Sequence, residues 1–284
     1  MPNGPDQNRR EPDGSVVVQF EAVTVRFDSE TALDRVSFTM RAGETRVILG
    51  AAGSGKTVLL KTAMGLQAAD SGRVLLFGQD ITRVPERELF TLRGRVGILF
   101  QEGGLFDSLT VEENVAYPLL NQRGRTPPTE EETEEAVREA LRFVELEHTL
   151  EQFPSELSGG MRRRVGIARA VVTEPGLVLY DSPTAGLDPI TANTIMALIL
   201  KERDTHNAAA LMATHRYQDG QLMANFRYNP HSGELQRVSV NGDGREGSTT
   251  KFMVMREGRL AFEGSQPELE ASADPYLSKF VLKR

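Results

Sequence analysis

A glycine-rich stretch of eight residues has the composition needed to hold the phosphates of a nucleotide. It fits the pattern G-x-x-x-x-G-K-[ST] and consists of Gly50, Ala51, Ala52, Gly53, Ser54, Gly55, Lys56 and Thr57. Glycines lack a Cβ, so several backbone N–H groups can converge on one anion. Lys56 would place its charge on the outer phosphates, and the Thr57 hydroxyl would coordinate Mg²⁺. The stretch therefore predicts a nucleotide site; the alternative is a glycine-rich turn that binds nothing.

The segments on either side of this stretch are those that such a loop requires. Residues 46–49 form a short apolar segment that we interpret as a buried strand, and residues 58–64 are typical of a helix. A helix that starts directly after the loop adds its positive N-terminal end to the anion site. The order strand, glycine loop, helix is the context that makes the pattern credible.

Three further polar residues, Gln101, Asp181 and His215, each follow a short apolar segment that we interpret as a strand. In open α/β sheets the ligand crevice lies beyond the carboxyl ends of the strands, so Gln101 is well placed to reach a nucleotide. A strand-borne aspartate such as Asp181, about 125 positions after Lys56, is what P-loop enzymes use to hold Mg²⁺.

Composition limits the classes of function. The chain has 284 residues, of which 39% are hydrophobic and 26% charged, as expected for a soluble globular protein. Without a run of about 18 apolar residues or an apolar signal core, we expect neither a bilayer span nor secretion. The absence of cysteine excludes disulfides and thiolate metal sites. A net charge of −7 argues against a nucleic-acid partner bound by bulk electrostatics, so a membrane role would need a protein partner.

The chain changes character along its length. We interpret residues 1–15, which are polar and contain prolines, as a disordered leader. Residues 16–27 and 36–40 alternate apolar and polar side chains, which favours antiparallel strands. Residues 226–250 are rich in Gly, Ser and Asn and predict a surface hairpin or a mobile insertion.

The segment 102–157 has helical character, and two helix starts can be recognised in it. Thr110 with Glu113 resembles a helix start with an acid in the first turn. Thr129 opens a second helix with the acidic run 130–135, which we interpret as a solvated helix start rather than a site for a metal or partner.

A second glycine-containing helix start lies at residues 157–161, Leu-Ser-Gly-Gly-Met, and it too is suited to meet a phosphate. With the P-loop and Asp181, it makes residues 16–284 resemble the ATP-binding subunits of ABC transporters. The resemblance implies an α/β P-loop NTPase fold with a parallel core sheet, an N-terminal antiparallel β layer and an inserted helical subdomain at about 102–157. It also implies a homodimer in which two ATP molecules lie between the P-loop of one chain and Ser158, Gly159 and Gly160 of the other.

The same resemblance gives roles to single residues. Gln101 corresponds to the Q-loop glutamine, which senses the metal and the γ-phosphate, and His215 to the switch histidine. Asp188 ends the D-loop, residues 185–188. Phe27 is the candidate for stacking on adenine; the alternative is that it belongs to the hydrophobic core, as a phenylalanine at a strand end often does. The implied Mg²⁺ ligands are Thr57, Gln101 and Asp181.

One position departs from the family pattern. Related ATPases have Asp-Glu-Pro where this chain has Asp181, Ser182 and Pro183. The glutamate polarises the attacking water, and serine is not an equivalent base because its hydroxyl is not ionised at neutral pH. Loss of a general base typically costs about 10²–10⁴ in rate. Three interpretations remain open: slow turnover using His215 or another carboxylate, a trapped form, and a switch that binds ATP without hydrolysing it.

A closer resemblance is to ATPases of the Mla/Mce type, which serve phospholipid trafficking. It lies in residues 103–111, 113–119 and 273–275, with Phe280 after them. It implies a lipid substrate, integral-membrane permease partners and a place at the cytoplasmic face of the membrane. The alternatives are an ATPase for another solute, with these segments serving only to pack the helical subdomain, and a soluble ABC protein of repair or translation. Proteins of the latter kind tend to have two cassettes or long coiled coils.

Overall fold

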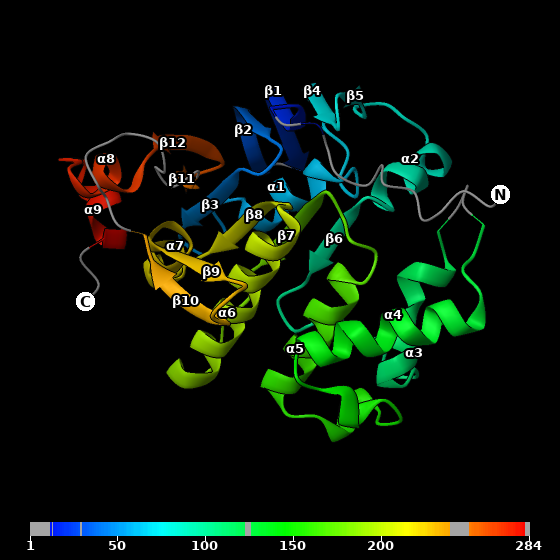
Figure 1. Ribbon diagram of the computed structural model, residues 1–284. Coiled ribbons are helices and arrows are strands. Elements are labelled where there is room, and N and C mark those ends of the chain that lie inside the picture. The colour runs from blue at the N-terminus through cyan, green and yellow to red at the C-terminus, as the bar shows by residue number, and fades with distance from the viewer. Residues whose placement is uncertain (1–11, 13, 29, 123–125, 239–249, 282–284) are drawn as a thin grey trace.

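The computed structural model describes residues 12, 14–28, 30–122, 126–238 and 250–281 (Figure 1). Nearly all of the expected leader, and residues 239–249 of the expected insertion, lie outside these residues.

Within the described residues, the core sheet has six strands in the spatial order β12, β11, β3, β8, β7, β6. In that order the strands span Arg259–Gly264, Thr250–Arg256, Thr45–Gly50, Ala209–Thr214, Leu177–Asp181 and Val96–Leu99. All neighbouring pairs are parallel except β11 with β12, which form an antiparallel hairpin. Every residue of β3, β7 and β8 is buried, as is typical of parallel strands covered on both faces.

A second, antiparallel sheet has the order β2, β1, β4, β5 (Figure 1). Its strands span Glu30–Arg41, Val16–Phe27, Ser71–Leu76 and Gln79–Asp80. Helix α1, Lys56–Ala63, joins the two sheets, because its Leu59 and Leu60 belong to one core cluster with Phe20 of β1 and Leu179 of β7. The predicted parallel sheet and antiparallel layer are both confirmed.

Among the described residues, three of the helices that follow α1 form a lobe of their own. Those after α1 are α2 Glu86–Arg93, α3 Val111–Leu120, α4 Glu130–Phe143, α5 Gly159–Val171, α6 Pro189–His206, α7 Tyr217–Asn225, α8 Gln266–Glu270 and α9 Pro275–Val281, with short 3-10 turns η1 Glu147–Thr149 and η2 Pro154–Glu156. Helices α3, α4 and α5 pack on one another and form a helical lobe beyond β6 (Figure 1). Among the described segments, no helix combines the length and the apolar character needed to cross a bilayer.

The two helix starts expected from the sequence are present in this lobe. Thr110 caps α3 and Thr129 caps α4, each in a reciprocal capping box with the glutamate three residues later. The glutamates of the acidic run are exposed in the first turns of α4, while Val137 and Leu141 farther along the helix are fully buried. Amphipathic spacing thus fixed which face of α4 packs against the lobe.

Part of the expected insertion forms a hairpin of β9, Phe226–Asn229, and β10, Glu234–Arg237. It packs along α6 (Figure 1). The Asp204 carboxylate of α6 accepts a hydrogen bond from the Tyr228 N–H at 2.7 Å. The Lys201 ammonium lies 4.3 Å from the ring centroid of Phe143 in α4, which links this side of α6 to the helical lobe.

Candidate functional site

The loop between β3 and α1 has glycines where the backbone leaves no room for a side chain. A Cβ on Gly50 would lie 2.4 Å from the Ser54 hydroxyl, and one on Gly55 would lie 2.4 Å from the Ala32 carbonyl. Gly55 also has φ +99° and stands at the N-cap of α1. The loop therefore requires glycine at both positions, and its backbone leads directly into a helix N-terminus.

Lys56 is the cation of this loop. Its Nζ donates hydrogen bonds to the carbonyls of Gly50 and Ala51, each at 2.8 Å. Burial lowers the pKa of Lys56 below the usual lysine value, while the charge of Asp181 acts in the opposite direction. A phosphate oxygen would offer this ammonium a charge-assisted bond in place of a neutral carbonyl.

The residues that could hold Mg²⁺ are oxygen donors, which suit this metal. Asp181 ends β7 and is 7% exposed, whereas Thr57, in the first turn of α1, is exposed. The neighbouring Ser182 adopts a left-handed conformation, φ +51°, and its hydroxyl donates to the Asp181 carboxylate at 3.3 Å. Ser182 thus donates a hydrogen bond to the expected metal ligand and offers no carboxylate of its own.

Strand register brings the separate sequence segments to one edge of the core sheet. Leu99 pairs with Tyr180, Asp181 with Ala213, and Thr214 with Leu49. The residues that follow these positions therefore emerge side by side at the carboxyl ends of neighbouring strands. They are Gly50 and the loop after it, Gln101, Ser182 and His215.

The signature residues belong to the helical lobe and not to this edge. Ser158 caps α5, accepting from the Met161 N–H at 3.2 Å, and both Ser158 and Gly159 are exposed. A Cβ on Gly160 would lie 2.7 Å from Thr191, so the starts of α5 and α6 pass close together.

Two other predicted residues are also exposed. Asp188 caps α6 by accepting from the backbone N–H groups of Ile190 and Thr191, and the hydrogen bonds from Thr191 hold its pKa below the usual range. Phe27, at the end of β1, is 45% exposed and is therefore not a core side chain. Its ring is open to a planar ligand.

One residue at the site escaped the sequence analysis. Asp219, in the first turn of α7, is 1% exposed and accepts hydrogen bonds from the hydroxyls of Thr184 and Thr214, each at 2.7 Å. Burial raises its pKa above the usual aspartate value. It joins the segment after Ser182 to the strand that precedes His215. The sequence around it is mostly polar and gave no signal that this aspartate is buried.

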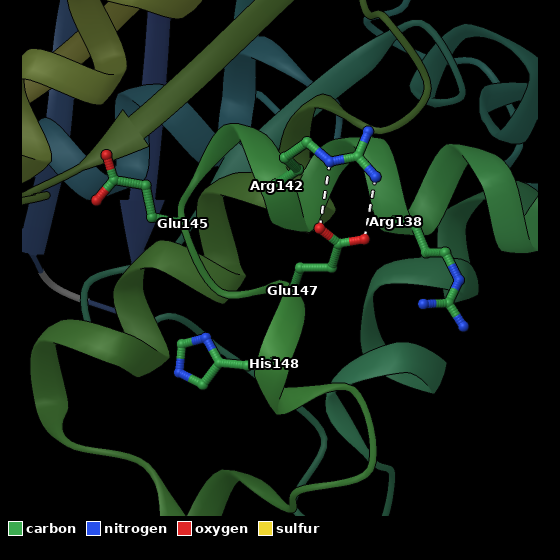
Figure 2. A pocket seen from close by; sticks show the side chains of 5 residues that line it. All are labelled: Arg138, Arg142, Glu145, Glu147 and His148. Atoms are coloured by element: carbon green, nitrogen blue, oxygen red, sulfur yellow. Dashed lines mark hydrogen bonds and ion pairs between the residues drawn. The ribbon is translucent and has the colours of Figure 1, made fainter.

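A hollow on the helical lobe is distinct from this edge (Figure 2). Its lining consists of Arg138, Arg142, Glu145, Glu147 and His148. Arg142 and Glu147 pair at 3.0 Å, so much of the charge in the hollow is balanced. None of the predicted site residues lies in it.

Comparison with known proteins identifies the family and the fold of the chain. The family model described as ABC transporter matches residues 33–185, more than half of the chain. The chain belongs to the ABC transporter family. A probable ribonucleotide transport ATP-binding protein, mkl, of Mycobacterium leprae is 38% identical to this ABC protein over 200 residues, covering 70% of the chain and 57% of the relative. The methionine import ATP-binding protein MetN of Rhizobium johnstonii is 40% identical over 202 residues, covering 71% and 55%.

The chain thus matches only a little over half the length of these curated relatives. Among solved structures, the dimeric post-hydrolysis state of the ATP-binding cassette MJ0796 bound to ADP and Pi has a TM-score of 0.72. It is 27% identical, and the match covers 88% of this chain and 98% of the other. The expected family and the expected ABC ATPase fold are confirmed.

Proposed function

We propose that this ABC protein is the ATP-binding motor subunit of a membrane transporter and that it hydrolyses ATP as a homodimer. One observation supports this most. Ser158 and Gly159 are exposed at the start of α5, a helix of the lobe, whereas the P-loop follows β3 of the core sheet. A signature exposed in this way is available to a nucleotide bound on a second copy. The dimeric MJ0796 structure gives an example of such an assembly in a relative.

Each residue at the sheet edge has a part in this proposal. The P-loop backbone and Lys56 hold the phosphates of ATP, and the Phe27 ring stacks on the adenine. Thr57, Gln101 and Asp181 would hold Mg²⁺, which would balance phosphate charge, and Gln101 would also sense the γ-phosphate. His215 orients the attacking water.

Dimer formation tests the core of the proposal. MgATP should convert the purified full-length chain from monomer to dimer, measured by analytical ultracentrifugation. Lys56→Ala should lose nucleotide binding. Ser158→Arg should still bind nucleotide but should not dimerise, because it blocks only the contact between the signature residues and the nucleotide on the second copy. A wild-type chain that binds MgATP yet stays monomeric at all concentrations would contradict the sandwich.

Ser182 raises a second candidate function, an ATP-dependent dimerisation module that does not hydrolyse. We favour slow turnover, in which His215, or a carboxylate other than the missing glutamate, acts on the water. Ser182→Glu should then raise the rate of phosphate release by about 100-fold or more. Ser182→Gln should not, because glutamine has the shape of glutamate but cannot act as a base. Equal turnover of the native chain and Ser182→Glu would refute this view of the site. Complete absence of phosphate release from the native chain would select the module.

We further propose that the partner is a permease and the cargo a lipid. The support is the resemblance in residues 103–119 and an exposed aromatic surface in the same segment. Phe106 and Tyr117 are 43% and 42% exposed, and their ring centroids lie 4.7 Å apart. Leu120, three residues after Tyr117 on α3, is 51% exposed. An exposed apolar group of this kind suits a protein contact.

Reconstitution of the chain in vesicles with a permease identified from the neighbouring genes would test the lipid assignment. MgATP should move a fluorescent phospholipid between vesicles or leaflets. Phe106→Ser with Tyr117→Ser should prevent assembly with the permease while leaving nucleotide binding by the free chain unchanged. Uptake of methionine or a nucleotide without phospholipid movement would assign the chain to another solute, as the names of its relatives would suggest.

A further inference from the structure

Four arginines lie along α5, and each donates hydrogen bonds to backbone carbonyls. The acceptors are Leu157 for Arg162, Gln101 for Arg163, Val144 for Arg164, and Gly103 and Gly104 for Arg169. Guanidinium groups give charge-assisted bonds in a fixed planar geometry. Two of the four therefore hold one short segment, residues 101–104, which we call the Q-loop backbone.

Arg163 holds the first residue of this segment. It is 6% exposed, and both its Nε, at 2.8 Å, and its Nη2 donate to the carbonyl of Gln101. Its Nη1 is buried and has no hydrogen-bond partner among the described residues. A buried guanidinium directed at one carbonyl fixes the position of that carbonyl, because moving it would leave the charge without a bond.

Arg169 holds the other end of the segment. Its Nη1 donates to the Gly104 carbonyl at 2.8 Å and its Nη2 to the Gly103 carbonyl at 3.0 Å. The same guanidinium lies 5.8 Å from the ring centroid of Phe106. Arg169 thus touches both the Q-loop backbone and the aromatic surface proposed for the permease.

Backbone contacts show how closely the segment lies on α5. A Cβ on Gly103 would be 2.9 Å from the Arg162 carbonyl, and a Cβ on Gly166 would be 3.0 Å from the Gly103 carbonyl. Gly103 has φ +85° and Gly104 φ +60°, so both also need glycine for their conformation. The loop and the helix leave no space for one to slide over the other.

We propose that Arg163 and Arg169 are positioning residues that join the Q-loop backbone to α5, so that Gln101, Ser158 and Phe106 move as one body. The consequence rests on the proposed function. When Ser158 engages the nucleotide on a second copy, α5 sets the position of Gln101 at its own nucleotide, and a displacement of Phe106 by the permease reaches both.

Amide hydrogen exchange of the nucleotide-free chain tests the clamp. The N–H of Gly103 donates to Phe100 and that of Phe106 to Asn114, so both amides are protected in the intact loop. Arg163→Gln and Arg169→Gln should speed exchange in residues 101–106 by about tenfold or more. Arg164→Gln is the matched control, because it removes a bond of the same type from the same helix but to Val144, and it should leave this peptide unchanged. Arg163→Lys, which restores a cation, should recover part of the protection.

The coupling itself is tested with nucleotide. Arg163→Gln should leave ADP affinity within about twofold of the native value, since ADP needs the P-loop and Phe27 but not the position of Gln101, while MgATP-driven dimerisation weakens about tenfold. Unchanged exchange in residues 101–106, or an equal increase in Arg164→Gln, would overturn the clamp. Faster exchange with normal dimerisation would overturn the coupling. A native chain that never dimerises would refute the proposed function alone, because the exchange result is obtained without nucleotide.

Discussion

Replacement of Asp219 by alanine should be among the most destabilising single changes at the site. The carboxylate accepts two buried hydroxyl donors, from Thr184 and Thr214, each at 2.7 Å. A hydrogen bond to a charged group contributes about 1.5–3 kcal/mol, so two of them give about 3–6 kcal/mol. Part of this is offset because a buried carboxylate, whose pKa is raised by burial, is also removed from an unfavourable environment. We therefore expect a loss of about 3 kcal/mol.

Asp219→Asn provides the matched comparison. Its amide oxygen can accept from both threonine hydroxyls, and the neutral group is easier to bury, so the loss should be about 1 kcal/mol. The expected order of free energies of unfolding is native, then Asp219→Asn, then Asp219→Ala. Urea unfolding followed by far-UV circular dichroism measures all three, and the chain has no tryptophan to report otherwise.

The pH dependence has a definite sign. Because the pKa of Asp219 is raised in the folded chain from its ordinary 3.8, the native state binds the proton more tightly than the unfolded state does. The unfolding free energy of the native chain relative to Asp219→Asn should therefore fall as pH rises from 3.8 through the raised pKa, and become constant above it. A loss below about 0.5 kcal/mol for Asp219→Ala, typical of a surface substitution, would refute the reasoning. So would equal losses for alanine and asparagine.

Two further predictions concern the loop lysine and a glycine of the core sheet. Burial lowers the pKa of Lys56 and the charge of Asp181 opposes this, so the affinity for metal-free ATP should fall as pH rises toward 10.5, and Asp181→Asn should move that fall to lower pH. Titration of a fluorescent nucleotide in the presence of a chelator measures the pH midpoint of the fall in the native chain and in the variant. Coincident midpoints would contradict an interaction between Lys56 and Asp181. A Cβ on Gly97 would lie 2.1 Å from the Ala170 carbonyl, so Gly97→Ala should cost about 3 kcal/mol in urea unfolding. Gly78→Ala, where no atom lies within 4 Å and only the φ of +74° opposes alanine, should cost about 1 kcal/mol, and equal losses would show that the close approach is relieved.

Local sequence determined the pieces of the site. The glycine spacing and Lys56 identified the loop, and the structure adds that Gly50 and Gly55 have no room for a Cβ. Capping residues fixed the starts of α3 and α4, because a threonine followed by a glutamate three positions later satisfies the first backbone donors whatever packs outside. Apolar periodicity found the strands, since it depends only on which faces are buried.

The tertiary structure decided which pieces meet. Spacing placed Asp181 and His215 at strand ends, but only the order β3, β8, β7, β6 put those ends next to one another, because pairing between distant strands leaves no local signature. The buried Asp219 was not predicted for the same reason: its two hydroxyl partners lie 35 and 5 positions away and approach it only in the folded sheet. Periodicity also did not reveal that Arg163 and Arg169 turn toward backbone carbonyls of the Q-loop. A sequence records that a residue is an arginine, while the acceptor it finds depends on the loop that the fold brings against its helix.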